Sequence, residues 1–211
     1  MLDHVLRQQK ASALRPVARA LRLLSPNTFT FTGLLVGLGA AFAAASGSYS
    51  LGVVLWILNR LLDGLDGEIA RASGRQSDLG GYLDILADYI IYAAVPAGLA
   101  YAGAAGFGYL SLTLLLSSFY LNAASWMYLA ALLEKRRAQA RYSTSIVMPG
   151  GLIEGTETGL FYTAMLLFPS AFSTLSLTMA ALVFATVVQR LVWSWHHLTP
   201  SHTSESRKDA L

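Results

Sequence analysis

Six long apolar stretches limit what this 211-residue chain can fold into more than any other feature. They cover residues 27–46, 50–71, 79–102, 108–133, 151–170 and 173–198. Each is long enough to cross a bilayer as an α-helix, which needs about 20 mostly apolar residues. Because a segment in lipid must satisfy its own backbone hydrogen bonds, each stretch is expected to be a helix. The sequence therefore predicts an all-α integral membrane protein, a six-transmembrane-helix bundle in a single domain over residues 1–211.

The composition agrees with a membrane protein. Only 13% of the residues are charged and 55% are hydrophobic, whereas soluble domains carry about 25% charged residues. The chain has no cysteine, which excludes disulfides, thiol catalysis and cysteine-ligated metals. The first 22 residues are polar and basic, unlike a cleaved signal peptide, whose apolar stretch comes sooner.

Lysine and arginine are distributed unevenly between the connections. The connections after the first, third and fifth stretches contain none, whereas the N-terminal segment, the other connections and the C-terminal tail are basic. By the positive-inside rule, both termini and the connection between the second and third stretches face the cytoplasm. We expect a multi-pass protein of the cytoplasmic (plasma or inner) membrane, with residues 199–211 as a cytoplasmic tail.

The N-terminal segment, residues 1–24, mixes leucine, valine and alanine with arginine and lysine. It is expected to form an amphipathic helix in the membrane interface; a solvated basic tail is the alternative. The basic residues of the whole chain border the apolar stretches. The chain's net charge of +3 therefore indicates attraction to anionic lipid rather than binding of nucleic acid. Membrane lipids are therefore expected partners, and nucleic acid is not.

The second and third stretches carry carboxylates at helical spacing. At positions i, i+3, i+4 and i+7, one face of the second stretch carries Asp63, Asp66, Gly67 and Ala70. At positions i, i+4 and i+8, the third stretch carries Gly80, Asp84 and Asp88. The connection is short, so the two helices should be antiparallel neighbours, and the four aspartates should converge across one gap. A rise of about 1.5 Å per residue places Asp63 and Asp88 about 12–13 Å from the cytoplasmic end, a depth suited to a reaction between a soluble molecule and a lipid.

These aspartates need compensation in a bilayer. Each costs roughly 2.5–3.5 kcal/mol at the centre of a spanning helix, and less near the interface. Pairing with Arg60, Arg71 and Arg75 is a structural alternative, but the last two lie toward the loop and cannot neutralise all four. Mg²⁺ and Mn²⁺ prefer oxygen ligands, and Mg²⁺ usually works with substrate phosphates. The sequence therefore predicts a Mg²⁺ or Mn²⁺ site.

The small residues on the same faces have two interpretations. Gly67, Ala70 and Gly80 either leave room for a flat ring or a phosphate chain, or allow close helix packing. Arg71, at the end of the carboxylate face, is a cation suited to holding a phosphate.

The pattern Asp63-x2-Asp66-Gly67-x2-Ala70-Arg71-x8-Gly80-x3-Asp84-x3-Asp88 resembles, at every fixed position, the signature of the CDP-alcohol phosphotransferase family. The six apolar stretches are also similar to that family's bundle. The resemblance implies a reaction in which a CDP-linked alcohol gives its phosphoryl-alcohol part to an acceptor hydroxyl and CMP leaves. It also implies a homodimer.

The resemblance further implies roles for individual residues. Asp63, Asp66 and Asp84 look like metal ligands, and Asp88 looks like a contributor to the metal site and the general base. The residues that look like contacts of the CDP group are Asp63, Gly67, Ala70, Arg71 and Gly80. An acceptor hydroxyl must lose a proton, and Asp88 is the deepest carboxylate in the gap, which agrees with the implied role.

Candidates for acceptor binding lie in the second half. Glu154 and Glu157 either bind the acceptor or pair with Arg141 or Arg190. Arg137 and Arg141 belong to a basic run that either binds a phosphorylated acceptor or is a positive-inside cluster, the favoured alternative.

At the start of the first stretch, Asn27 or Thr30 either reaches the nucleotide or, as we favour, caps the helix.

The most consistent interpretation is a metal-dependent enzyme of phospholipid biosynthesis that uses CDP-diacylglycerol and a small polar alcohol. An alternative within the family is transfer from CDP-choline or CDP-ethanolamine to diacylglycerol. An alternative from another class is a divalent-cation transporter. The carboxylates cluster toward one side of the membrane with Arg71 beside them, which favours the enzyme. The sequence does not identify the acceptor.

Overall fold

The computed structural model describes residues 13–103, 107–139 and 150–199. A short helix over residues 13–20 comes first. The elements that follow are α2 (Pro26–Ala45), α3 (Tyr49–Ser73), α4 (Asp78–Gly103), α5 (Phe107–Gln139), α6 (Gly155–Leu167), the 3₁₀ helix η1 (Pro169–Ala171) and α7 (Phe172–Leu198). No strand occurs in the three described ranges, so the all-α prediction is confirmed.

Four of the six predicted stretches match helices to within two residues at both ends: α2, α3, α4 and α7. The fourth stretch, 108–133, begins one residue after the start of α5, which then continues to Gln139. The fifth does not match, because α6 begins only at Gly155 and has 13 residues. At about 1.5 Å per residue it is about 20 Å long, shorter than the roughly 30 Å hydrocarbon core of a bilayer. Among the described residues, three segments are long and apolar enough to cross a membrane: Pro26–Ala45, Asp78–Gly103 and Pro169–Leu198.

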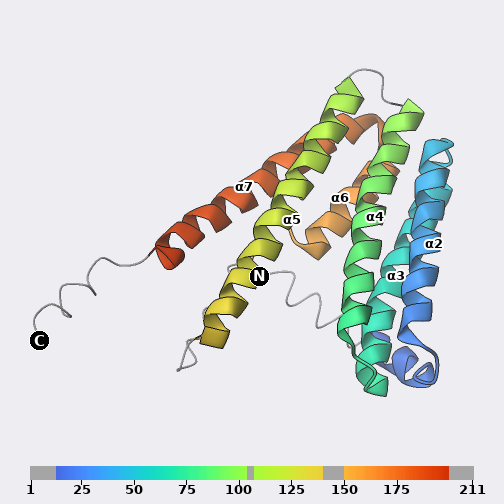
Figure 1. Ribbon diagram of the computed structural model, residues 1–211. Coiled ribbons are helices and arrows are strands. Elements are labelled where there is room, and N and C mark those ends of the chain that lie inside the picture. Colours follow the sequence, from blue (N-terminus) through green and yellow to red (C-terminus); the bar gives the residue numbers. More distant parts are fainter. Residues whose placement is uncertain (1–12, 104–106, 140–149, 200–211) are drawn as a thin grey trace, which may run out of the picture.

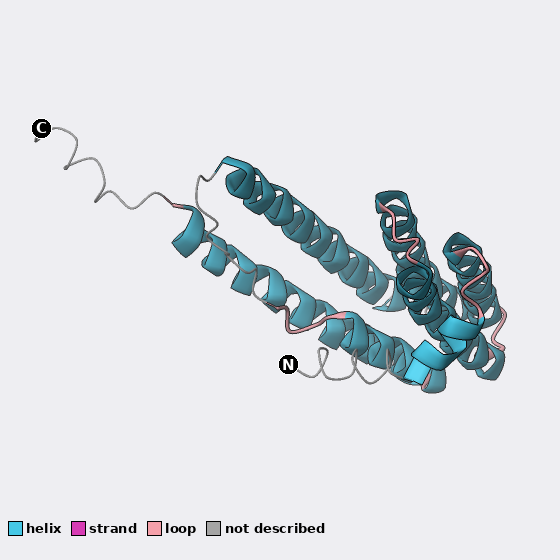
Figure 2. Ribbon diagram, turned by 90° about the horizontal axis from the view of Figure 1, so that it is seen from below, coloured by secondary structure: helices cyan, strands magenta, loops and turns pink. Residues whose placement is uncertain are grey.

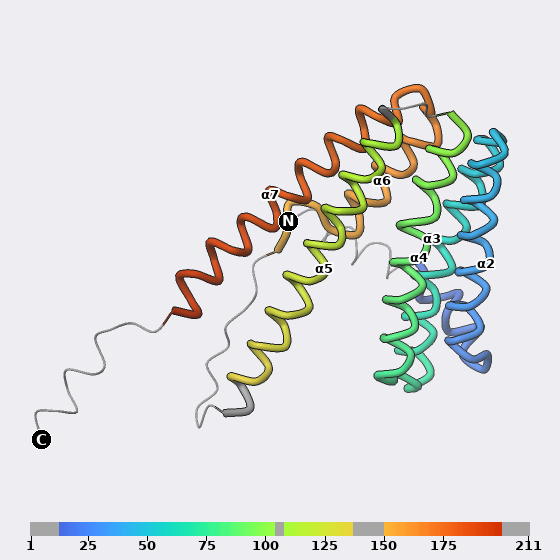
Figure 3. The backbone as a smooth tube through the Cα atoms, turned by 45° about the horizontal axis from the view of Figure 1, so that its top comes forward, coloured from blue at the N-terminus to red at the C-terminus, as the bar shows by residue number. Residues whose placement is uncertain are grey.

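The helices form two groups (Figure 1). α2, α3 and α4 lie side by side, whereas α5 and α7 form a long pair that slants away from them. The view from below separates the two groups clearly (Figure 2), and the backbone trace shows α6 between them (Figure 3). α6 begins part-way along the bundle rather than at the level of the α3–α4 turn. A shared core joins the groups through Trp56, Ile91, Tyr162, Met165 and Met179, all at most 1% exposed.

Small residues bring α4 against α2. A Cβ atom on Gly98 would collide with the backbone carbonyl oxygen of Ala41, and one on Gly37 would lie 2.6 Å from Cδ1 of Ile91. Such positions let helices in a membrane approach at backbone distance. This close contact fixes α4 beside α2, and α3 packs against α2 as well, so the three helices hold a common site.

The helix over residues 13–20 packs on α3. Ala18 is fully buried and forms a small cluster with Leu65 and Ile69. Residues 1–12 lie outside the described residues, so an interfacial amphipathic segment over residues 1–24 stays a prediction.

Candidate active site

A tight turn makes α3 and α4 antiparallel. Gly74 ends α3 with φ of +66°, a left-handed conformation that glycine adopts without steric cost. The Arg75 N–H then donates to the Ala70 carbonyl oxygen at 3.0 Å, as at many helix C-termini. Ser77 Oγ accepts a hydrogen bond from the Gly80 N–H at 3.1 Å and so caps the start of α4. The turn places the carboxylate faces of both helices opposite each other.

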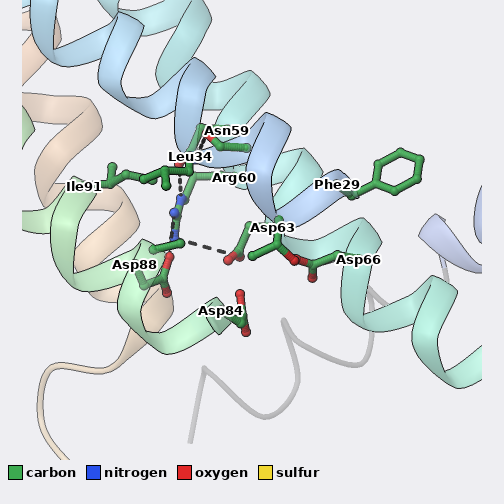
Figure 4. Close-up of a pocket in the computed structure, with 12 residues that line it drawn as sticks. Phe29, Leu34, Asn59, Arg60, Asp63, Asp66, Asp84, Asp88 and Ile91 are labelled. Carbon is green, nitrogen blue, oxygen red and sulfur yellow. Dashed lines mark hydrogen bonds and ion pairs between the residues drawn. The ribbon is translucent and has the colours of Figure 1, made fainter. Parts of the chain in front are cut away.

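The four predicted aspartates line one pocket (Figure 4). Asp63 and Asp66 enter it from α3, and Asp84 and Asp88 from α4. Asp66 is only 5% exposed, and the other three are partly buried. The convergence expected from helical spacing is therefore present in the structure.

The start of α2 completes the pocket. Thr30 Oγ1 donates a hydrogen bond to Asp66 Oδ2 at 2.7 Å. Helix capping by Asn27 or Thr30, the favoured expectation, is wrong, since the cap residue of α2 is Ser25 and it makes no side-chain cap hydrogen bond. Asn27 instead lies beside Gly80, with its Oδ1 atom 3.6 Å from where a Cβ would stand there.

Arg60 is the cation that lines this pocket. Its Nη2 atom lies 2.8 Å from Asp88 Oδ1, and its Nη1 atom lies 3.8 Å from Asp63 Oδ2. The pairing alternative is therefore correct for Arg60. The sequence analysis predicts Arg60 only as a counter-ion. Its position three residues before Asp63 nevertheless places it near the carboxylate face of the helix.

The pocket fits a divalent cation by charge and by donor type. Its lining holds four carboxylates and one guanidinium, and buried carboxylates without compensation are costly. Carboxylate oxygens are the donors that Mg²⁺ and Mn²⁺ prefer. Within the part of the chain that the structure describes, no three histidine or acidic side chains are already close enough to hold a metal.

Of the residues expected to contact CDP, Asp63 is one of the carboxylates that line the pocket. The other four are not in its lining and lie in sequence between the carboxylates and the α3–α4 turn: Gly67, Ala70, Arg71 and Gly80. The Arg71 guanidinium lies over Gly67, where an added Cβ would be 3.3 Å from Nη2. Ala70 and Gly80 are partly buried. Arg71 also donates to Glu68 Oε1 at 2.7 Å.

Glu68 is a residue that the sequence reasoning missed. It is 6% exposed, and its second oxygen lies 3.9 Å from Arg15 of the N-terminal helix. Its position three residues before Arg71 was the available signal.

The two glutamates that were candidates for acceptor binding lie at the N-terminal cap of α6. Glu154 and Glu157 form a capping box, in which the Glu154 N–H donates to Glu157 Oε2 at 3.1 Å. The Gly151 N–H donates to Glu154 Oε1 at 3.0 Å. Among the described residues, neither glutamate forms a direct ion pair with Arg190, although Glu154 is near enough to attract it electrostatically. Arg190 Nη1 instead donates to Asn122 Oδ1 of α5 at 3.0 Å.

The other acceptor candidates are not tested by these contacts. Arg141 and the side chain of Arg137 lie outside the described residues. Acceptor binding by Glu154, Glu157, Arg137 or Arg141 stays a prediction.

A helical protein with four carboxylates in one pocket between its helices has clear relatives. The model of the CDP-alcohol phosphatidyltransferase family matches residues 23–189. The chain is 36% identical over 198 residues to the inner membrane protein YnjF of Escherichia coli, covering 92% of this chain and 95% of that protein. It is 29% identical over 196 residues to the archaetidylinositol phosphate synthase of Methanothermobacter thermautotrophicus, covering 87% and 93%.

Solved structures agree. The phosphatidylinositol phosphate synthase PgsA1 of Mycobacterium tuberculosis with CDP-DAG bound has a TM-score of 0.68 at 26% identity, covering 86% of this chain and 93% of that one. Its complex with manganese and citrate has the same TM-score and identity, with 86% and 88% covered. The chain belongs to the CDP-alcohol phosphatidyltransferase family. It is thus a transferase of substituted phosphate groups in phospholipid biosynthesis, and the resemblance seen in the signature is confirmed.

Proposed function

We propose that this protein transfers the phosphatidyl group of CDP-diacylglycerol to the hydroxyl of a small polar alcohol and releases CMP, with the help of Mg²⁺ or Mn²⁺. The observation that carries the proposal is the convergence of four carboxylates from α3 and α4 in one pocket. The PgsA1 structures with CDP-DAG and with manganese support the donor and the metal by similarity. They favour this donor over CDP-choline or CDP-ethanolamine, and the family favours an enzyme over a cation transporter.

In this proposal, one set of residues holds the metal and another contacts the CDP group. Asp63, Asp66 and Asp84, with Asp88 contributing, hold the metal, which when bound neutralises charge on the pyrophosphate. Gly67, Ala70, Arg71 and Gly80 contact the CDP group on the side of the pocket toward the α3–α4 turn, and Asp63 contacts it from within the carboxylate cluster.

The reaction then needs a proton acceptor. Asp88 takes the proton of the acceptor hydroxyl. The oxygen of that hydroxyl attacks the phosphorus that carries the diacylglycerol oxygen. The bond from that phosphorus to the CMP oxygen breaks, and CMP leaves. Positioning and electrostatic stabilisation supply most of the catalysis in such transfers.

The membrane arrangement is part of the proposal. Residues 1–211 form one domain whose six apolar stretches lie in the membrane, with both termini and the pocket at the cytoplasmic side, and two copies form a homodimer. Ser48 and Ser77 lie at opposite ends of α3 and its flanking turn. In intact cells, an impermeant thiol reagent should label Ser48→Cys and not Ser77→Cys; the reverse would overturn the orientation.

Chemical cross-linking in the membrane should yield a dimer, and a monomer alone would contradict the homodimer.

The activity is tested with purified protein and labelled CDP-diacylglycerol. A panel of acceptors should include serine, glycerol phosphate and inositol phosphate, and the lipid products should be identified by mass spectrometry. We expect CMP release that needs one acceptor, stops with chelator and returns with Mg²⁺ or Mn²⁺. Release that continues in chelator would contradict the metal, and turnover with CDP-choline and diacylglycerol instead would contradict the donor.

A further inference from the structure

Arg60 is held rigidly inside the pocket by aromatic rings. Its side chain is 19% exposed. The guanidinium carbon lies 4.9 Å from the ring centroid of Trp56 and 5.3 Å from that of Tyr92. Tyr162 is stacked on Trp56 at 5.2 Å and fully buried, so the rings cannot easily move away. Cation–π contacts of this kind fix the plane of a guanidinium.

Hydrogen bonds then fix its orientation within that plane. Nε donates to Asn59 Oδ1 at 2.8 Å, and Nη1 donates to the Tyr92 hydroxyl at 3.0 Å. Asn59 is itself bonded to the Gly33 carbonyl oxygen at 2.8 Å, so α2, α3 and α4 all contribute to holding the group. The remaining nitrogen, Nη2, points at Asp88 Oδ1 at 2.8 Å (Figure 4).

We propose that Arg60 is a positioning residue for Asp88: it binds Oδ1 and thereby turns Oδ2 toward the acceptor hydroxyl. This inference rests on the proposed function, in which Asp88 accepts the proton of that hydroxyl. Arg60 is outside the signature pattern and has no role in that function so far. A guanidinium suits the task because it offers several donors in one rigid plane.

The charge of Arg60 separates this role from simple support of the pocket. A cation near Asp63 and Asp88 opposes the binding of a second cation to the same carboxylates. Replacing Arg60 with an apolar side chain should therefore tighten metal binding while it slows the reaction. A residue that merely kept the pocket folded would weaken both when removed.

The test compares Arg60→Met and Arg60→Lys with Arg75→Met as the matched control. Arg75 is exposed and bonds the Leu23 carbonyl oxygen, away from the pocket. Two quantities are measured: kcat of CMP release, and the affinity of the substrate-free protein for Mn²⁺ by electron paramagnetic resonance. Because a misplaced catalytic group can cost about 10²-fold, we expect Arg60→Met to lower kcat about 10²-fold and to bind Mn²⁺ several-fold more tightly. Arg60→Lys should recover part of kcat, and Arg75→Met should match the wild type in both.

A double variant decides whether Arg60 acts through Asp88. Residues that act as one unit have non-additive effects on kcat. Arg60→Met should therefore slow the Asp88→Asn variant by less than threefold. A further slowing equal to the full single-variant effect would overturn the proposal, as would loss of Mn²⁺ affinity in Arg60→Met. If Arg60→Met does not fold, Arg60→Lys in the same double variant carries the test. A wild type that releases no CMP from any CDP-alcohol would overturn the proposed function itself, whereas an active wild type with additive effects overturns only the role of Arg60.

Discussion

Two regions of the molecule bury polar groups among apolar helices, and their charges differ. The pocket between α3 and α4 holds four carboxylates and one guanidinium. The cluster between α5 and α7 is centred on Arg190, which is 6% exposed and bonds neutral oxygens of Asn122 and Ser125. Within the described residues, its Nε atom has no hydrogen-bond partner.

The difference indicates different tasks. An excess of carboxylates in a buried site favours a cation from outside the chain. Arg190 instead links two helices with hydrogen bonds to charge-neutral acceptors, which stabilises the α5–α7 pair. Substitutions in the first region should therefore change metal binding and catalysis, and substitutions in the second should change stability.

The largest effect is expected for the metal ligands. Asp63→Asn, Asp66→Asn and Asp84→Asn should each lower CMP release by roughly a thousandfold or more, since a bound metal supplies several kcal/mol of charge stabilisation. Mn²⁺ affinity of the purified variants should fall in parallel. Asp78→Asn is the matched control, because Asp78 is exposed in the first turn of α4 and outside the pocket. Normal Mn²⁺ binding in all three variants would contradict the assignment.

Asp88→Asn should have the next largest effect. Asparagine keeps the shape of the side chain but cannot take the proton, so kcat should fall by roughly 10²–10⁴. Binding of CDP-diacylglycerol, measured by displacement of a labelled CDP-alcohol, should survive because the other three aspartates remain. Parallel loss of donor binding would show that Asp88 is chiefly a metal ligand, and near-normal kcat would remove it from the mechanism.

A smaller effect, on stability, is expected in the other region. Arg190→Met breaks the hydrogen bonds to Asn122 and Ser125 and should cost about 1–3 kcal/mol. The melting temperature in detergent should fall by several degrees, at about 2–4 °C per kcal/mol. Arg136→Met is the control, because Arg136 also joins α5 to α7 but is exposed. A large loss of Mn²⁺ affinity in Arg190→Met would erase the contrast between the two regions.

The smallest effect is expected at the α6 cap. Glu154→Ala removes one half of the capping box and should cost on the order of 1 kcal/mol, seen as a fall of a few degrees in melting temperature. Glu157→Gln should change it less, because glutamine can still accept the N–H of Glu154. If Glu157→Gln leaves stability intact but raises the KM of an acceptor, the acceptor role predicted for this residue gains its first support.

The sequence predicted the pocket because all four aspartates lie on two helices joined by a short turn. Helical spacing and that turn are enough to bring Asp63 and Asp88 together. The contacts of Arg190 with Asn122 and Ser125 join residues 68 and 65 positions apart, and no local spacing rule reaches so far. Thr30 likewise meets Asp66 only through the packing of α2 on α3.

The fifth apolar stretch starts four residues before α6 for a different reason. Counting apolar residues from Gly151 onward ignores capping, whereas the backbone at Glu154 is extended, with φ of −122° and ψ of −165°. Glutamates at the cap and three residues later satisfy the first free N–H groups of a helix. The spacing of Glu154 and Glu157 was therefore a signal for the helix start.

The central claim is that the carboxylates of α3 and α4 hold a divalent cation. It is tested most directly by anomalous scattering from crystals of the protein grown with Mn²⁺. The account predicts a manganese peak within bonding distance of carboxylate oxygens of Asp63, Asp66 and Asp84. A fully occupied peak elsewhere in the molecule, with these aspartates paired only to arginine side chains, would contradict it.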